Sequence, residues 1–272
     1  MTFVMGQYLE IINDALMAGY RAVRQSRHSA LHRKIGRGSY GDLTYGIDKI
    51  AENAVLGRIN KCLPNARVVS EEAGILGSPT AQTNVLLDPI DGSTNAFRTV
   101  PFYSTALAIA DGPRFSDIKA AGVINICNGQ MIMAEEGRGT WAGKTKAIPS
   151  KVKDWERAYI CVDMNFKSFS PEEIAITSRL LEKLDHPRSL GSAALETAMI
   201  STGSIDAFVE VAPRLRAFDC MPSLFLVREA GGFLQRLGGV MDDYLLDSRE
   251  RLAYVAAATN NLGEKIMGLL EI

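Results

Sequence analysis

Hydrophobic residues recur at helical spacing in two segments near the N-terminus. An apolar residue occupies every third or fourth position in residues 2–27 and again in residues 48–63, after which Pro64 follows. This period is that of an amphipathic helix, and proline does not continue one. The intervening residues 28–42 are basic and contain three glycines, so the pattern predicts a mobile loop there.

Short runs rich in valine, isoleucine, leucine and alanine follow, and turn residues bound them. They predict strands at residues 67–70, 84–87, 103–110, 120–126 and 130–134. Acidic residues come at the ends of the first two of these strands. Loops at strand ends are common places for functional side chains, so we expect the chemistry there.

A change in composition near Pro149 predicts a junction between an N-terminal α+β lobe, residues 1–148, and a C-terminal α/β lobe, residues 149–272. In the second lobe, Ser170 followed by Pro171 and two glutamates is typical of a helix start. Further elements are expected at residues 193–202 (helix), 207–211 (strand) and 219–232 (helix ending in glycines). Interleaved helices and strands indicate the α/β or α+β class.

Composition narrows the class of protein. The chain has 272 residues and a formal net charge of −1, which argues against nucleic acid as the main partner. The four cysteines form no C-x-x-C pair, as is usual in a reducing compartment. No window reaches the roughly 18 apolar residues of a membrane span, and no signal-peptide layout is present. We expect a globular cytoplasmic protein with no membrane partner.

The segment Asp88–Asn95, with the sequence DPIDGSTN, holds the most informative chemistry. Its proline and glycine fix a sharp bend, which can aim Asp88 and Asp91 into one pocket. Two carboxylates and a backbone carbonyl suit Mg²⁺, and the amides and hydroxyls that follow can hold a phosphate. Glu71, at the end of the preceding strand, can join the same cluster.

Ordinary structural roles compete with this interpretation. A D-P-x-D-G run is also turn chemistry, and Asp48 and Asp219 stand where helix caps are common. Five acids at the ends of predicted elements are nevertheless hard to explain by capping alone.

Asp88–Asn95 resembles the D-P-[IL]-D-G-[ST]-x-N signature of the inositol monophosphatase family. Further segments resemble the family's other motifs in the same order, namely residues 69–72 (VSEE), 139–143 (GTWAG), 188–194 (RSLGSAA) and Asp219 with 227–232 (VREAGG). Residues 44–52 and 210–219 are similar to those of archaeal members. Such members commonly hydrolyse both inositol monophosphates and fructose-1,6-bisphosphate.

The resemblance implies a layered α-β-α-β-α sandwich, a homodimer, and a Mg²⁺-dependent phosphate monoester hydrolase with its site between the lobes. It implies two or three ions per site. The first is assigned to Glu71, Asp88 and the carbonyl of Ile90, the second to Asp88, Asp91 and Asp219, and a weaker third to Glu71.

The same resemblance implies how water and substrate are held. Asp48 and Ser93 match the pair that orients and deprotonates the attacking water, with Glu71 beside them and no covalent phosphoenzyme. The implied phosphate contacts are Gly92, Ser93 and Thr94, and the implied polyol contacts are Gly191, Ser192 and Ala193.

The resemblance indicates the preferred substrate less clearly than it indicates the reaction, because Ala212 stands where members of the family carry an arginine or a glutamate. A second phosphate needs a cation, for which Arg216 and Arg214 are candidates near Glu210. Alternatively, Arg214 is solvated and Arg216 pairs with Glu210. We expect inositol-1-phosphate as first substrate above a modest fructose-1,6-bisphosphatase activity. Another sugar phosphate, a phosphorylated nucleotide, or a non-catalytic regulatory protein with this fold are the alternatives.

Overall fold

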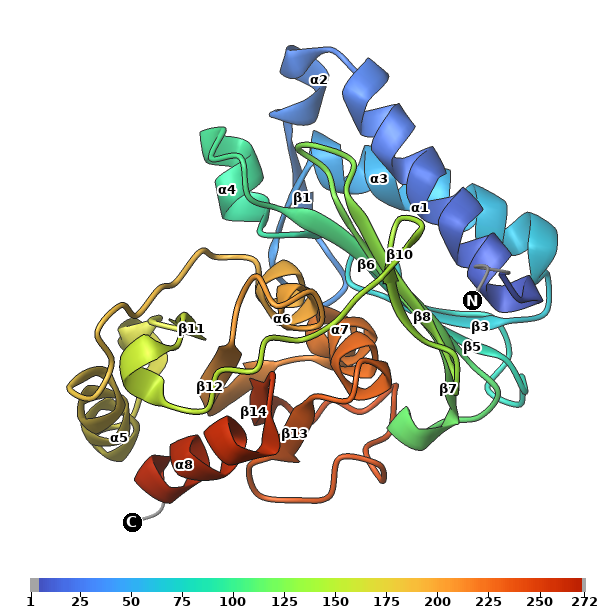
Figure 1. Cartoon of the computed structure of the whole chain (residues 1–272). Coiled ribbons are helices and arrows are strands. Elements are labelled where there is room, and N and C mark those ends of the chain that lie inside the picture. The colour runs from blue at the N-terminus through green and yellow to red at the C-terminus, as the bar shows by residue number, and fades with distance from the viewer. Residues whose placement is uncertain (1–4, 271–272) are drawn as a thin grey trace.

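The computed structural model describes residues 5–270, apart from the side chain of Ser168. An eight-stranded sheet is its largest element (Figure 1). The strand order is β10 (Thr145–Lys146), β9 (Gly139–Ala142), β8 (Met131–Glu135), β7 (Ile118–Asn125), β6 (Ser104–Ala110), β5 (Asn84–Asp91), β3 (Arg67–Ser70) and β4 (Gly74–Leu76). Neighbours are antiparallel except for β3 and β5, which are parallel.

A four-stranded sheet forms a second layer in the C-terminal half. Its order is β11 (Ile160–Val162), β12 (Ala207–Leu215), β14 (Leu252–Ala257) and β13 (Phe233–Arg236). Helices α1 (Gln7–Gln25) and α3 (Gly46–Cys62) cover one face of the large sheet, and α6 (Ala193–Ile200) and α7 (Ala217–Glu229) lie between the sheets. Helices α5 (Pro171–Leu181) and α8 (Asn260–Leu270) cover the outer face of the small sheet. The α-β-α-β-α sandwich is confirmed.

The central apolar core crosses the boundary expected near residue 149. Strands β6 and β7 contribute Ala108 and Val123, while α7 and β14 contribute Leu224 and Tyr254 to the same buried cluster. Burying apolar surface of both sheets on the same two helices ties the halves together.

Most predicted elements are present within a few residues. Helix α1 ends at Gln25, and positions 2–4 of the predicted helix lie outside the described residues. The helix start at Ser170 is confirmed, since its hydroxyl accepts the amide of Glu173 at 3.2 Å. No helix among residues 5–270 is long and apolar enough to cross a membrane.

The predicted mobile loop at residues 28–42 is wrong. Its first part forms a short helix, α2 (His28–Leu31), and the next forms β1 (Lys34–Arg37), which pairs antiparallel with β2 (Leu43–Tyr45). Gly41, with φ +93°, supplies the turn between the strands. All four residues of β1 are exposed, so the segment lacks the apolar–polar alternation that reveals a strand.

Two strands continue past the ends predicted for them, through prolines. Strand β5 runs on to Asp91 through Pro89, and β12 runs on to Leu215 through Pro213. In both cases the register with the neighbouring strand shifts around the proline, which has no N–H to give to the ladder. These irregular strand ends are where the acidic segment and the entry to α7 begin.

Candidate active site

One cavity of about 540 Å³ gathers carboxylates from the end of β3, from β5 and from α7. Strands β3 and β5 are parallel and in register, Ser70 opposite Leu87, so the residues that follow each lie side by side. These are Glu71 and Asp88. The lining also includes Ile90, Asp91, Gly92, Ser93, Thr94, Gly191 and Asp219. The structure therefore brings the whole predicted metal-ligand set together.

Gly92 makes the turn that aims this segment. Its φ of +88° lies in the left-handed region, and a Cβ there would stand 2.9 Å from the carbonyl oxygen of Gly191. Both features require glycine. Ser93 then begins helix α4 (Ser93–Arg98), with Thr94 exposed at the cavity.

Asp88 is a buried carboxylate of the cluster with one oxygen that no donor in residues 5–270 satisfies. It is 2% exposed, and its Oδ1 is buried with no hydrogen-bond partner among the described residues. Burial, followed by the charges of Glu71 and Asp91, raises the pKa of Asp88 well above its usual value. A buried carboxylate oxygen without a donor, surrounded by other carboxylates, is suited to a bound cation.

Glu71 lies in the same electrostatic environment. Burial and the neighbouring charge of Asp219 raise the pKa of Glu71, and Arg216 opposes this shift. Hard oxygen donors with mutual repulsion are the donor set that Mg²⁺ or a similar ion needs, so the residues present fit the implied metal.

Backbone amides hold the other two ligands in place. Asp91 Oδ2 accepts the amide of Ala194 at 2.9 Å and the hydroxyl of Ser192, and Asp219 Oδ2 accepts the amide of Arg216 at 2.6 Å. Asp219 thus also has the capping role considered from the sequence. Burial raises the pKa of Asp91 to about 7 and that of Asp219 to about 6. As they stand in residues 5–270, no three His, Cys, Asp or Glu side chains are gathered closely enough around one point to hold an ion.

Asp48 and Ser93 form a hydroxyl–carboxylate pair beside the cluster. Ser93 Oγ lies 3.1 Å from Asp48 Oδ1 and 2.9 Å from the carbonyl of Ile90. Asp48 is 1% exposed, in the first turn of α3, and its Oδ2 accepts the amide of Tyr45 at 2.5 Å. Burial, with help from the charge of Glu72, raises the pKa of Asp48 to about 7.

The two arginines pair with different acids from those expected. Arg216 pairs with Asp42 and lies 3.7 Å from Glu71, whereas Arg214 pairs with Glu210 at 2.8 Å and also with Asp163. The expected alternative, a solvated Arg214 and an Arg216–Glu210 pair, is wrong. Side chains four residues apart on β12 share a face, while Arg216 follows the strand's end and turns toward the acidic cluster.

The predicted polyol contacts lie next to Asp91. Gly191, Ser192 and Ala193 line a smaller cavity of about 200 Å³ together with Asp91. The hydroxyl of Ser192 is buried and bonded to Asp91, so in this structure it positions a carboxylate. Glu210 is fully buried against Arg214 and does not line either of these two cavities.

Two positioning residues escaped sequence reasoning. The side-chain amide of Asn95 donates to the carbonyls of Leu190 and Phe102, at 2.7 and 2.8 Å. The carboxylate of Glu196 accepts the amides of Leu190 and Ser192, at 2.8 and 3.2 Å. Together they fix the turn that faces Asp91. An acid within the apolar run 193–200 was the available signal for Glu196.

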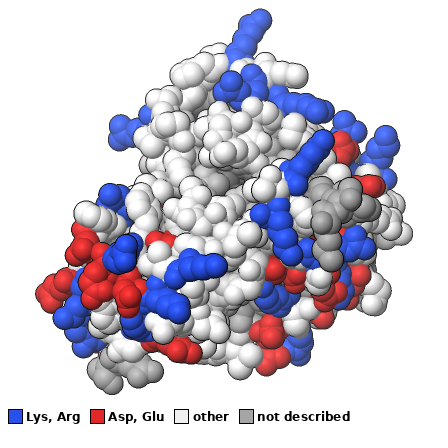
Figure 2. Space-filling model, viewed as in Figure 1, with Lys and Arg blue, Asp and Glu red and all other residues white. Residues whose placement is uncertain are grey.

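Positive charge lies on one side of this site. The sequence contains no Asp or Glu between Asp14 and Asp42, and Arg37 lines the acidic cavity. Figure 2 shows Lys and Arg side chains, without acidic ones, at the end of the molecule where α2 lies. Local positive potential attracts anionic substrates even when the net charge is close to zero.

Comparison with known proteins places the chain among the phosphatases, which are phosphoric monoester hydrolases. The model of the inositol monophosphatase family matches residues 6–271, and the chain belongs to that family.

Individual relatives and a solved structure are similar to this chain over most of its length. The fructose-1,6-bisphosphatase/inositol-1-monophosphatase of Methanothermobacter thermautotrophicus is 30% identical over 248 residues, which are 88% of this chain and 87% of the relative. Nus factor SuhB of Escherichia coli is 28% identical over 200 residues, 73% of each chain. The crystal structure of the extragenic suppressor protein suhB from Bartonella henselae superposes with a TM-score of 0.84 at 21% identity, covering 98% of this chain and 99% of that one.

Proposed function

We propose that this phosphatase hydrolyses small polyol or sugar phosphate monoesters with Mg²⁺, and that inositol-1-phosphate is its preferred substrate. Fructose-1,6-bisphosphate is the weaker substrate. The observation that carries the proposal is the Ser93–Asp48 hydrogen bond beside the unpartnered oxygen of Asp88. It places a proton acceptor next to a group of carboxylates that requires cations.

Glu71, Asp88 and the carbonyl of Ile90 would hold one ion, Asp88, Asp91 and Asp219 a second, and Glu71 a weaker third. Bound Mg²⁺ supplies positive charge for the phosphate and the leaving oxygen and lowers the pKa of water. The chain's own contribution is to place these carboxylates in one buried cavity before substrate arrives.

Ser93 and Asp48 would act together on the attacking water. As the water oxygen attacks phosphorus, its proton passes to Ser93 Oγ while the Ser93 proton passes to Asp48 Oδ1. A general base is most effective with a pKa near the working pH, and that of Asp48 is raised to about 7. The bond from phosphorus to the ester oxygen breaks as the new bond forms, that oxygen takes a proton from solvent water to leave as the alcohol, and no covalent phosphoenzyme is needed.

Substrate would lie between α4 and α6. Gly92, Ser93 and Thr94 would hold the reacting phosphate, and Gly191, Ser192 and Ala193 the polyol. Arg216, the cation expected for a second phosphate, is already paired with Asp42, which supports preference for a monophosphate. Replacing Ala212 by arginine should not supply a cation for the second phosphate, because Ala212 is buried and the larger side chain does not fit there.

A comparison of kcat/KM across substrates tests this order. The panel is inositol-1-phosphate, fructose-1,6-bisphosphate, another sugar phosphate and a phosphorylated nucleotide, each with Mg²⁺. A preference for the bisphosphate of about tenfold or more, or 1.4 kcal/mol, contradicts the order but leaves the phosphatase assignment intact.

The relative named Nus factor SuhB supports a second candidate, a regulatory protein on the same fold. Absence of Mg²⁺-dependent phosphate release from the whole panel would favour it. We further propose a homodimer, which sedimentation measures directly, and the division of the chain into lobes at residues 148 and 149.

A further inference from the structure

A second, larger cavity lies beside Arg216, outside the carboxylate cluster. It measures about 750 Å³, within the range of small-molecule sites. Its apolar walls are Val69 from β3, Ile75 from β4 and Phe218 from α7. Of the residues assigned to the phosphatase reaction, its lining shares Arg216 alone.

Arginines give this cavity an excess of positive charge. Arg249 and Arg251 come from the segment just before β14 and are exposed. Within the described part of the chain, neither is paired with a carboxylate. Asp247, the acid among the lining residues, already pairs with Arg67 at 2.8 Å. Guanidinium groups without a counter-charge at a cavity favour an oxyanion there.

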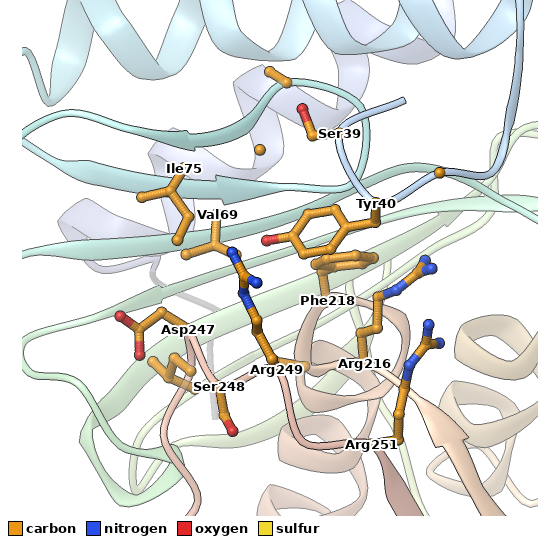
Figure 3. Close-up of a pocket in the computed structure, with 15 residues that line it drawn as sticks. Ser39, Tyr40, Val69, Ile75, Arg216, Phe218, Asp247, Ser248, Arg249 and Arg251 are labelled. Atoms are coloured by element: carbon orange, nitrogen blue, oxygen red, sulfur yellow. The ribbon is translucent and has the colours of Figure 1, made fainter. Parts of the chain in front are cut away.

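Tyr40 adds a ring and a free donor to the same space. Its ring lies edge-on to that of Phe218, with the centroids 5.2 Å apart. The hydroxyl of Tyr40 has no hydrogen-bond partner among residues 5–270. Figure 3 shows the phenol reaching into the cavity toward Val69, with the guanidinium of Arg249 close by. A donor and a cation thus converge beside apolar and aromatic surface.

We propose that this cavity binds a small molecule that carries both a phosphate-like dianion and a flat apolar group. The dianion meets Arg249 and the Tyr40 hydroxyl, and the apolar group lies on the walls of Val69, Ile75 and Phe218. A lone phosphate would leave most of the volume and all of the apolar surface unused. Arg216, which lines the cavity and lies 3.7 Å from Glu71, stands between the occupant and the acidic cluster.

Calorimetric titration of metal-free protein with phenylphosphonate tests the proposal. This probe has a flat ring and a dianion, and its C–P bond is not a phosphate ester. Metal removal leaves a site of repelling carboxylates, so binding there is disfavoured. We expect saturable binding that Arg249→Ala weakens about tenfold or more. Arg179→Ala, the same change at an exposed position on α5, is the matched control and should leave binding unchanged.

The role of the apolar wall is tested separately. Ile75→Asn should weaken phenylphosphonate binding more than the binding of inorganic phosphate, because only phenylphosphonate has an apolar group to lie on that wall. Arg249→Ala should keep the wild-type melting temperature and Mg²⁺-dependent turnover. Failure of phenylphosphonate to bind wild-type protein saturably, or equal binding by Arg249→Ala, overturns the proposal. Neither result bears on the phosphatase assignment.

Discussion

Ser93 Oγ lies 3.1 Å from Asp48 Oδ1, although 45 residues separate them in the chain. The contact exists because α3 packs against β5, so that the first turn of α3 meets the turn that ends β5. It joins a hydroxyl in the acidic cavity to a carboxylate shielded from solvent. In the proposed mechanism, this contact is the path by which a proton leaves the attacking water.

Mutation of both members should show that they act as one unit. Ser93→Ala, Asp48→Asn and the double variant should lower kcat by similar factors, because each breaks the same proton path. Initial rates at saturating Mg²⁺ measure this. Losses that multiply in the double variant would mean that the two residues act independently.

Magnesium should stabilise the protein, most strongly at high pH. Burial and mutual repulsion raise the pKa of Glu71, Asp88, Asp91 and Asp219 in the metal-free protein, so they must lose protons before an ion binds. At about 100 times the Kd the gain is about 2.7 kcal/mol.

Melting curves of the metal-free protein with and without Mg²⁺, at pH 6 and pH 8, check this expectation. Asp88→Asn should lose most of the magnesium-dependent shift. The same shift in that variant would remove Asp88 from the ligand set.

Glu210 should make stability fall as pH rises. Burial and Asp163 raise the pKa of Glu210 to about 9, above that of the unfolded chain. Between these values the folded state holds a proton that the unfolded state has released, so the unfolding free energy decreases with increasing pH. Glu210→Gln removes this proton exchange.

Urea unfolding of the wild type and of Glu210→Gln, between pH 5 and pH 9, measures the difference. The variant should become more stable relative to the wild type as pH rises. A constant difference would show that Glu210 titrates alike in both states.

The sequence allowed more of the site to be predicted than of its surroundings. The acids could be placed together because each follows a strand or begins a helix, and β3 and β5 are in register. The partner of Arg216 could not be predicted. The pairing depends on where β12 ends and on a hairpin of exposed residues that brings Asp42 close to Arg216. The cavity beside Tyr40 is lined by four segments that are far apart in the sequence, so no local sequence pattern predicts it.

Phosphate release from inositol-1-phosphate by the wild type and by Asp91→Asn, at saturating Mg²⁺, tests the central claim most directly. Asp91 is half-buried and held by the amide of Ala194, so asparagine removes the charge with little change in shape. We expect release to require Mg²⁺ and to fall about 100-fold or more in the variant, because an ion contributes several kcal/mol to the transition state. Near-normal turnover by Asp91→Asn would contradict the assignment of this carboxylate cluster as the metal site.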